Sequence, residues 1–138
     1  MTLPLLPLRA AIRAACAADS VLPGLLGGEP GPFDEPPRGA PPLYAVFGDA
    51  VLHDRSSSGG VGHEQDMSIV LHARPGSAAS ALTAADRLAA ILDDGAFALV
   101  GHHLVRLSVA RLDLDRDPET RLARTTLRLV AVTESLAP

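Results

Sequence analysis

The chain has 138 residues, about the length of one domain, with 47% hydrophobic but only 3% aromatic residues, so its core must consist of Leu, Val, Ile and Ala. Twelve basic residues stand against 16 acidic ones, and the net charge of −4 argues against avid binding to the phosphate backbone of nucleic acids. The single cysteine, Cys16, excludes an intramolecular disulfide and a cysteine-rich zinc site.

The N-terminal residues predict a short amphipathic helix that ends before Pro23. Pro7 suits its first turn, where the missing N–H is not needed. Cys16 is expected on the flank of this helix as a structural thiol. Because two prolines interrupt the first apolar run and arginines follow, we expect neither an export signal nor a membrane span. The apolar face is formed by Leu8, Ile12 and Ala15.

Residues 22–42 are rich in Pro and Gly and predict a long irregular segment within a single domain spanning residues 1–138. A connection of this length indicates either disorder or a contact segment.

Two strands are predicted around the middle of the chain. The first covers residues 43–53, and Gly48 is expected to mark a bulge in it. In the second, Met67, Ile69 and Leu71 alternate with more polar positions, the period of a half-buried strand. The two strands predict a hairpin with a long tip.

A second helix is predicted from an N-cap at Ser77 to about Asp94, with Gly95 placed to end it. Its apolar stripe is expected to contain Leu82, Ala85, Leu88, Ala89 and Leu92.

Two further strands complete the chain, joined by a turn over residues 113–120. The order helix, two strands, helix, two strands predicts an α+β fold: a four-stranded, mainly antiparallel sheet with two helices on one face. The alternating positions are Val105, Leu107 and Val109 in the third strand and Leu127, Leu129 and Ala131 in the fourth.

The tip between the first two strands is the most unusual stretch of the sequence. A phosphate-binding loop would end in Gly-Lys-Ser/Thr and open a helix, whereas this chain contains no Lys and a strand follows. We therefore expect a protein-interaction loop. It comprises Arg55, Ser56, Ser57, Ser58, Gly59, Gly60, Val61 and Gly62.

The titratable residues give weak signals for a metal. A small metal-dependent hydrolase using His53, His63 and His72 is one alternative, but strand geometry does not bring three histidines together. The adjacent His102 and His103 should point to opposite faces of a strand.

The D-x-D-x-D spacing of Asp113, Asp115 and Asp117 resembles the start of a calcium loop. Pro118 and Arg124 stand where such a loop needs its glycine and its bidentate acid. The serines of residues 56–58 form no G-x-S-x-G elbow. We predict no catalytic residue, no cofactor and no metal site, and hence no enzyme.

The order and spacing of several segments resemble the small tail-terminator (tail-completion) proteins of long-tailed bacteriophages and of phage-like gene transfer agents. The resemblance covers nearly the whole chain. An aromatic residue, typically Trp, is expected where His72 stands, and an Arg where Val130 stands. The segments are LPLLPLRAAI, FDEPPRGAPPLYAVFGDA, DRSSSGGVGHEQDMSIVLHAR, the Ala-rich second helix and RDPETRLARTTLRLVAVTE.

The resemblance implies a subunit of a six-membered ring at the head-proximal end of the tail tube. Such a ring ends tube polymerisation and contacts the head connector or stopper protein, while DNA passes through its lumen without specific binding. The protein would assemble in the bacterial cytoplasm and remain in the neck of the particle. A neighbouring stopper-type neck protein is the alternative within the same particles.

Overall fold

The computed structural model describes residues 3–29, 31–39 and 41–136. Pro30 and Ala40, which belong to the predicted irregular segment, lie outside the described residues, as do residues 1–2 and 137–138. The elements are α1 (Leu5–Ala18), α2 (Leu22–Leu25), β1 (Leu43–Asp54), β2 (Gly62–Ala73), α3 (Ala78–Leu92), β3 (His102–Arg116) and β4 (Ala123–Ser135).

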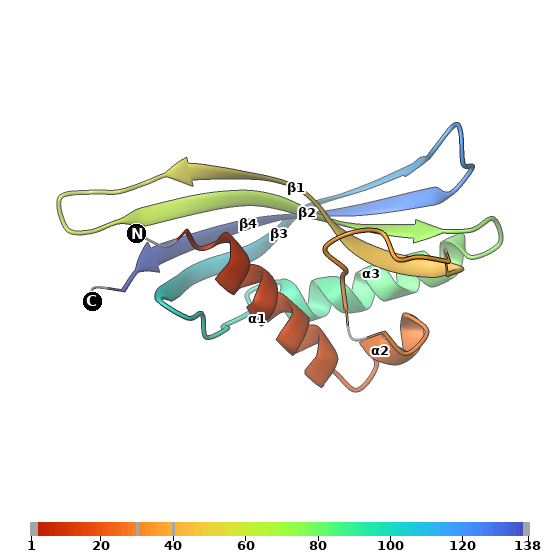
Figure 1. Ribbon diagram of the computed structural model, residues 1–138, viewed down its shortest axis with the longest axis horizontal. Helices are drawn as coiled ribbons and strands as arrows, with labels where there is room; N and C mark the ends of the chain where they lie inside the picture. Colours follow the sequence, from red (N-terminus) through yellow and green to blue (C-terminus); the bar gives the residue numbers. More distant parts are fainter. Residues whose placement is uncertain (1–2, 30, 40, 137–138) are drawn as a thin grey trace.

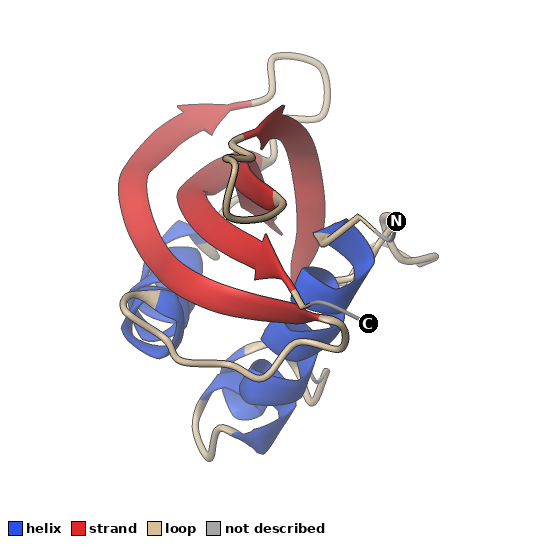
Figure 2. Cartoon of the chain, turned by 90° about the vertical axis from the view of Figure 1, so that its left-hand side faces the viewer, coloured by secondary structure: helices blue, strands red, loops and turns tan. Residues whose placement is uncertain are grey.

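The four strands form one antiparallel sheet in the order β1-β2-β4-β3. The central β2–β4 ladder runs without a bulge from the Gly62–Glu134 pair to the Ala73–Ala123 pair. Figure 1 shows α1 and α3 on the same side of the sheet, and the end view in Figure 2 shows the sheet curving away from them. The predicted α+β class and element order are therefore confirmed.

The core lies between the helices and the inner face of the sheet, which is the face toward α1 and α3. The predicted alternation in β2 and β4 is correct, since every second residue of each strand is buried there. None of the helices in the described part of the chain is long and apolar enough to cross a membrane. The buried apolar residues of these two strands are Met67, Ile69, Leu71, Ala73, Leu127, Leu129 and Ala131.

Helix α1 places Leu8, Ile12 and Cys16 on one buried stripe, four residues apart. Cys16 therefore belongs to the core, and its expected place on the helix flank was wrong. Burial, and secondarily the carboxylate of Asp19, raises the pKa of the thiol to about 12.

Helix α3 differs from the sequence prediction at both ends. The side chain of Ser77 makes no capping hydrogen bond, and only its carbonyl accepts the N–H of Ala81. The helix ends at Leu92, and Asp94 rather than Gly95 adopts the left-handed conformation, with φ 59°. The backbone N–H of Asp94 donates to the carbonyl of Leu107, which ties the helix end to β3.

The buried stripe of α3 consists mainly of alanines, which let the helix approach the sheet closely. Leu82 was predicted in this stripe but is 42% exposed, and Ala89 is only partly buried. The buried residues are Ala81, Ala84, Ala85, Leu88 and Leu92.

The strands are longer than predicted. β2 begins at Gly62 rather than near Met67, and β3 continues to Arg116, so the predicted turn at residues 113–120 was misplaced. Val105 lies in β3 but is 50% exposed, because a bulge between Leu104 and Arg106 interrupts the alternation.

The described residues of the 22–42 segment pack against their own chain. The segment contains α2, which was not predicted, and it buries Leu22 and Leu26 in the core. Phe33 forms a parallel bridge to β1: its N–H donates to Ala45 and its carbonyl accepts from Phe47. Part of this segment thereby covers the edge of β1, which limits unwanted strand pairing.

An ion pair joins the helices. Both oxygens of Asp19 accept hydrogen bonds from the guanidinium of Arg87 on α3, one of them from Nε at 2.9 Å. The same carboxylate accepts the backbone N–H groups of Val21 and Leu22 at the start of α2. Asp19 therefore links the end of α1, the start of α2 and α3.

We expect Asp19→Asn to lower the melting temperature by more at about pH 7 than at about pH 2.5, where part of the Asp19 contribution has been lost. The hydrogen bonds from Arg87, and secondarily from Leu22, hold the pKa of Asp19 well below its ordinary value of 3.8. A depressed folded-state pKa contributes stability above the unfolded value, which is lost as the pH falls through the folded-state value. Melting curves across this range, with Asp86→Asn as an exposed control, measure the effect. An equal difference at both pH values would contradict it.

Leu107→Asp should unfold the subunit. Leu107 is 1% exposed on the inner face of β3, and an unpaired buried charge costs several kcal/mol against a total stability of about 5–15 kcal/mol. Val105→Asp on the same strand is the matched control, since Val105 is half exposed and should tolerate a charge. Circular dichroism melts report both, and a folded Leu107→Asp variant with normal melting would refute the assignment.

Candidate interaction surface

The tip loop, residues 55–62, lies at the end of the β1–β2 hairpin, which extends beyond the helices at the left of Figure 1. Residues 55–61 are all exposed. The loop is narrower than predicted, because Ser57 and Gly60 exchange backbone hydrogen bonds of 2.9 and 3.1 Å. Arg55 donates its N–H to Gly62 at 2.8 Å. The hairpin thus continues to a two-residue turn formed by Ser58 and Gly59.

The serines of the tip loop hydrogen-bond to its own backbone. The Ser56 hydroxyl accepts the N–H of Gly62, and the Ser57 hydroxyl accepts the N–H of Gly59. The N–H of Ser56 donates to Asp54 at 2.8 Å, and hydrogen bonds from Ser56 lower the pKa of Asp54. These hydrogen bonds stabilise the turn at the end of the hairpin.

The tip loop is also attached to the C-terminal strand. The N–H of Ser135 in β4 donates to the carbonyl of Val61 at 2.8 Å. A shallow hollow lies between the loop and the end of β4, lined by both. The loop and this strand end therefore form one continuous exposed surface.

Arg55 was predicted to offer its guanidinium to a partner. In the structure it lies 3.6 Å from the Glu64 carboxylate and donates to the carbonyl of Asp54 at 3.3 Å. Its side chain is still 56% exposed, so the Glu64 contact is a weak surface pair.

The outer face, which is the sheet face opposite the helices, carries a network of charges around a bulge at Gly48 and Asp49. The bulge predicted at Gly48 is confirmed. A Cβ at this position would lie 2.3 Å from the Ser68 hydroxyl, which instead donates to Asp49 at 2.6 Å. Arg128 lies 3.6 Å from Asp49 and 3.2 Å from Asp113, so it bridges β1, β4 and β3. The Ser68 hydrogen bond, with help from Arg128, lowers the pKa of Asp49.

His72 stands where the resemblance leads us to expect an aromatic residue, and its ring makes an aromatic stacking contact. Its ring stacks on Tyr44 of the neighbouring strand with a centroid distance of 5.0 Å. Burial, followed by the charge of Arg124, lowers the pKa of His72 and favours the neutral ring.

The three aspartates of the D-x-D-x-D sequence pair with arginines, and Asp115 and Asp117 share Arg124. Asp113 pairs with Arg111 and Arg128, and Asp115 pairs with Arg124. Asp117 accepts the backbone N–H of Glu119 in the turn. Their spacing therefore reflects ion pairing across a hairpin.

The histidines are placed as strand geometry requires. His63 is buried on the inner face, His72 lies near the opposite end of β2, and His53 lies on the outer face, so the three do not form a site. His102 is buried while His103 is exposed, as predicted.

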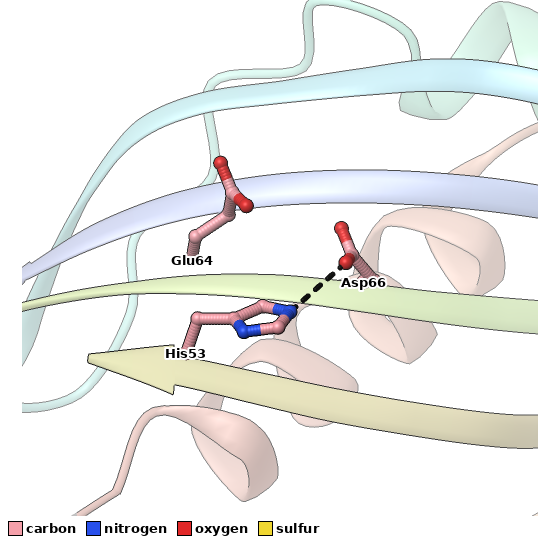
Figure 3. Close-up of side chains that lie close together, drawn as sticks. All are labelled: His53, Glu64 and Asp66. Atoms are coloured by element: carbon pink, nitrogen blue, oxygen red, sulfur yellow. Dashed lines mark hydrogen bonds and ion pairs between the residues drawn. The ribbon is translucent and has the colours of Figure 1, made fainter. Parts of the chain in front are cut away.

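A different cluster is present beside the tip loop. His53 on β1 lies opposite Glu64 on β2, and its Nε2 is 3.2 Å from the Asp66 carboxylate (Figure 3). Among the described residues, these are the three whose ligand atoms gather within 4.8 Å of one another. The sequence analysis did not predict this cluster, because it considered three histidines as ligands and not one histidine with two carboxylates. Pairing His53 with Glu64 required the strand register, which depends on the bulge and on the length of the tip loop.

Comparisons with known proteins agree with the resemblance. The family model described as tail completion protein gp17 matches residues 10–134. A solved structure titled "Virion of native gene transfer agent (GTA) particle" contains a chain that is 25% identical, with a TM-score of 0.87. That match covers 98% of this chain and 100% of the other. A comparison with curated proteins found no match.

The matched residues include β1, β2, α3, β3, all of β4 except Ser135, and most of α1. They also include the whole tip loop and the outer-face charges. The chain therefore belongs to the tail completion protein gp17 family, structural proteins of phage-type tail assembly.

Proposed function

We propose that this protein is a ring-forming tail terminator, six copies of which end tail-tube polymerisation and join the tail to the head connector. Family membership and the likeness to a chain of a gene transfer agent virion support this role. The main support for the proposal is the tip loop: it is exposed and extends beyond the helix layer, where a partner protein can reach it.

The shape of the subunit favours a head-to-tail contact between copies. The β1–β2 and β3–β4 hairpins lie at opposite ends of the sheet; the first extends past the helices and the second rises away from them (Figure 1). The β3–β4 hairpin also exposes two large apolar side chains, Leu112 at 41% and Leu114 at 59%. Contacts between unlike surfaces of identical subunits generate closed rings when the rotation closes.

The sheet edges are less suited to that contact, because the chain partly covers both. Phe33 pairs with β1 on one edge. On the other, Asp94 donates its N–H to Leu107, and the side chain of Asp93 accepts the N–H of Val109. Covered edges discourage open-ended strand addition, so we assign the ring contacts to the two hairpins.

The charge of the subunit is compatible with DNA passage. With a net charge of −4, a ring of these subunits would not retain DNA in its lumen, since like charges repel. In this arrangement the tip loop contacts a neighbouring subunit or the tail-tube protein, and it loses its remaining freedom on binding. Electron micrographs of the purified protein, alone and mixed with tail-tube protein, test for the ring; a subunit that stays monomeric in both would contradict the proposal.

Replacing residues 56–61 by Asn-Gly should preserve folding but weaken the joining of tails to heads. Arg55 and Gly62 already form a hydrogen-bonded pair, which a two-residue Asn-Gly turn closes well. The variant loses the Val61 contact to Ser135 and the exposed turn. Its melting temperature and the fraction of tailed particles in micrographs are the two measurements.

Ser58→Ala keeps the length of the tip loop and serves as the matched control. It should assemble as the wild type does, since no described hydrogen bond of the loop uses the Ser58 hydroxyl. Normal particles from the shortened variant would show that the loop is only a connector.

A further inference from the structure

We propose that His53, Glu64 and Asp66 form a binding site for a divalent transition-metal ion such as Zn²⁺ on the outer face, next to the tip loop. The inference does not depend on the proposed function, because it concerns the isolated subunit. An imidazole and two carboxylates are three ligands that zinc accepts, and three protein ligands leave further positions open to water.

The three side chains converge because of the strand register. His53 lies directly opposite Glu64 in the β1–β2 ladder, and Asp66 follows two residues later on the same face of β2. Figure 3 shows the ring of His53 directed at the Asp66 carboxylate, with Glu64 projecting beside it. The strands thus place the ligands without help from a flexible loop.

The distances suit a metal of this kind. A tetrahedral ion bound at about 2.0–2.2 Å holds its ligand atoms about 3.3–3.6 Å apart. The His53 Nε2 and Asp66 Oδ2 atoms are already 3.2 Å apart, and all three ligand atoms lie within 4.8 Å of one another. A change of the Glu64 side-chain rotamer would bring its carboxylate to the same ion.

The ligand types select among metals. Two carboxylates supply two negative charges for a divalent cation, and the imidazole favours zinc, nickel or copper over magnesium and calcium, which prefer oxygen ligands. The guanidinium of Arg55, 3.6 Å from Glu64, is the competing cation at the site. The proposal therefore also predicts that removing this charge strengthens metal binding.

Isothermal titration of the untagged, chelator-treated protein with Zn²⁺ tests the proposal. The wild type should bind one ion per subunit. His53→Ala and Asp66→Asn should each weaken binding at least about tenfold, because even the loss of a residue that only orients a ligand costs about 10–100-fold. Arg55→Gln should tighten binding by up to about fivefold, the range of an exposed charge pair.

The matched control is His103→Ala. His103 is an exposed histidine that also lies opposite a glutamate, Glu134, but it is not part of a three-ligand group among the described residues. This variant should bind Zn²⁺ as the wild type does. Absence of stoichiometric binding by the wild type, or equal affinity in the wild type, His53→Ala and Asp66→Asn proteins, would overturn the proposal.

Discussion

The β2–β4 ladder is the constraint on which the rest of the subunit depends. It is the one strand pair that runs from end to end without a bulge, and its inner residues form the floor of the core. A slip of one residue would turn Ile69 and Leu129 outward and bring Asp66 and Arg128 under the helices. Because burial fixes the register of β2 and β4, the bulges of the sheet occur only in the edge strands, β1 and β3.

The two faces of the sheet are stabilised by different interactions. The inner face is apolar and packs against the alanines of α3 and the stripe of α1, so its stability comes mainly from the area removed from water. On the outer face, Arg128 of β4 pairs with Asp49 of β1 and Asp113 of β3. Ser68 connects β2 to this network through its hydrogen bond to Asp49. Exposed ion pairs contribute little energy, so the outer face adds less to the stability of the sheet than the inner face does.

The sequence predicted the class of the fold and the core strands well, because alternation such as Met67, Ile69 and Leu71 follows directly from burial on one side. It failed where tertiary contacts override local preference. After α3 ends at Leu92, Asp94 rather than Gly95 adopts the left-handed conformation, and its N–H donates to Leu107 across the fold. The strand ends were underestimated since polar residues such as Asp113 and Glu64 pair across the ladder on the outer face. The His53 cluster was out of reach for the same reason: it is a property of register, which one sequence does not reveal.

The burial of Cys16 has a practical consequence for chemical labelling. The only thiol of the chain is enclosed in the core, and its pKa of about 12 leaves almost no thiolate at neutral pH. Thiol-reactive dyes or spin labels should therefore find no target on the folded protein. A cysteine introduced at any exposed position would be the sole reactive group, without first removing the natural one and disturbing α1.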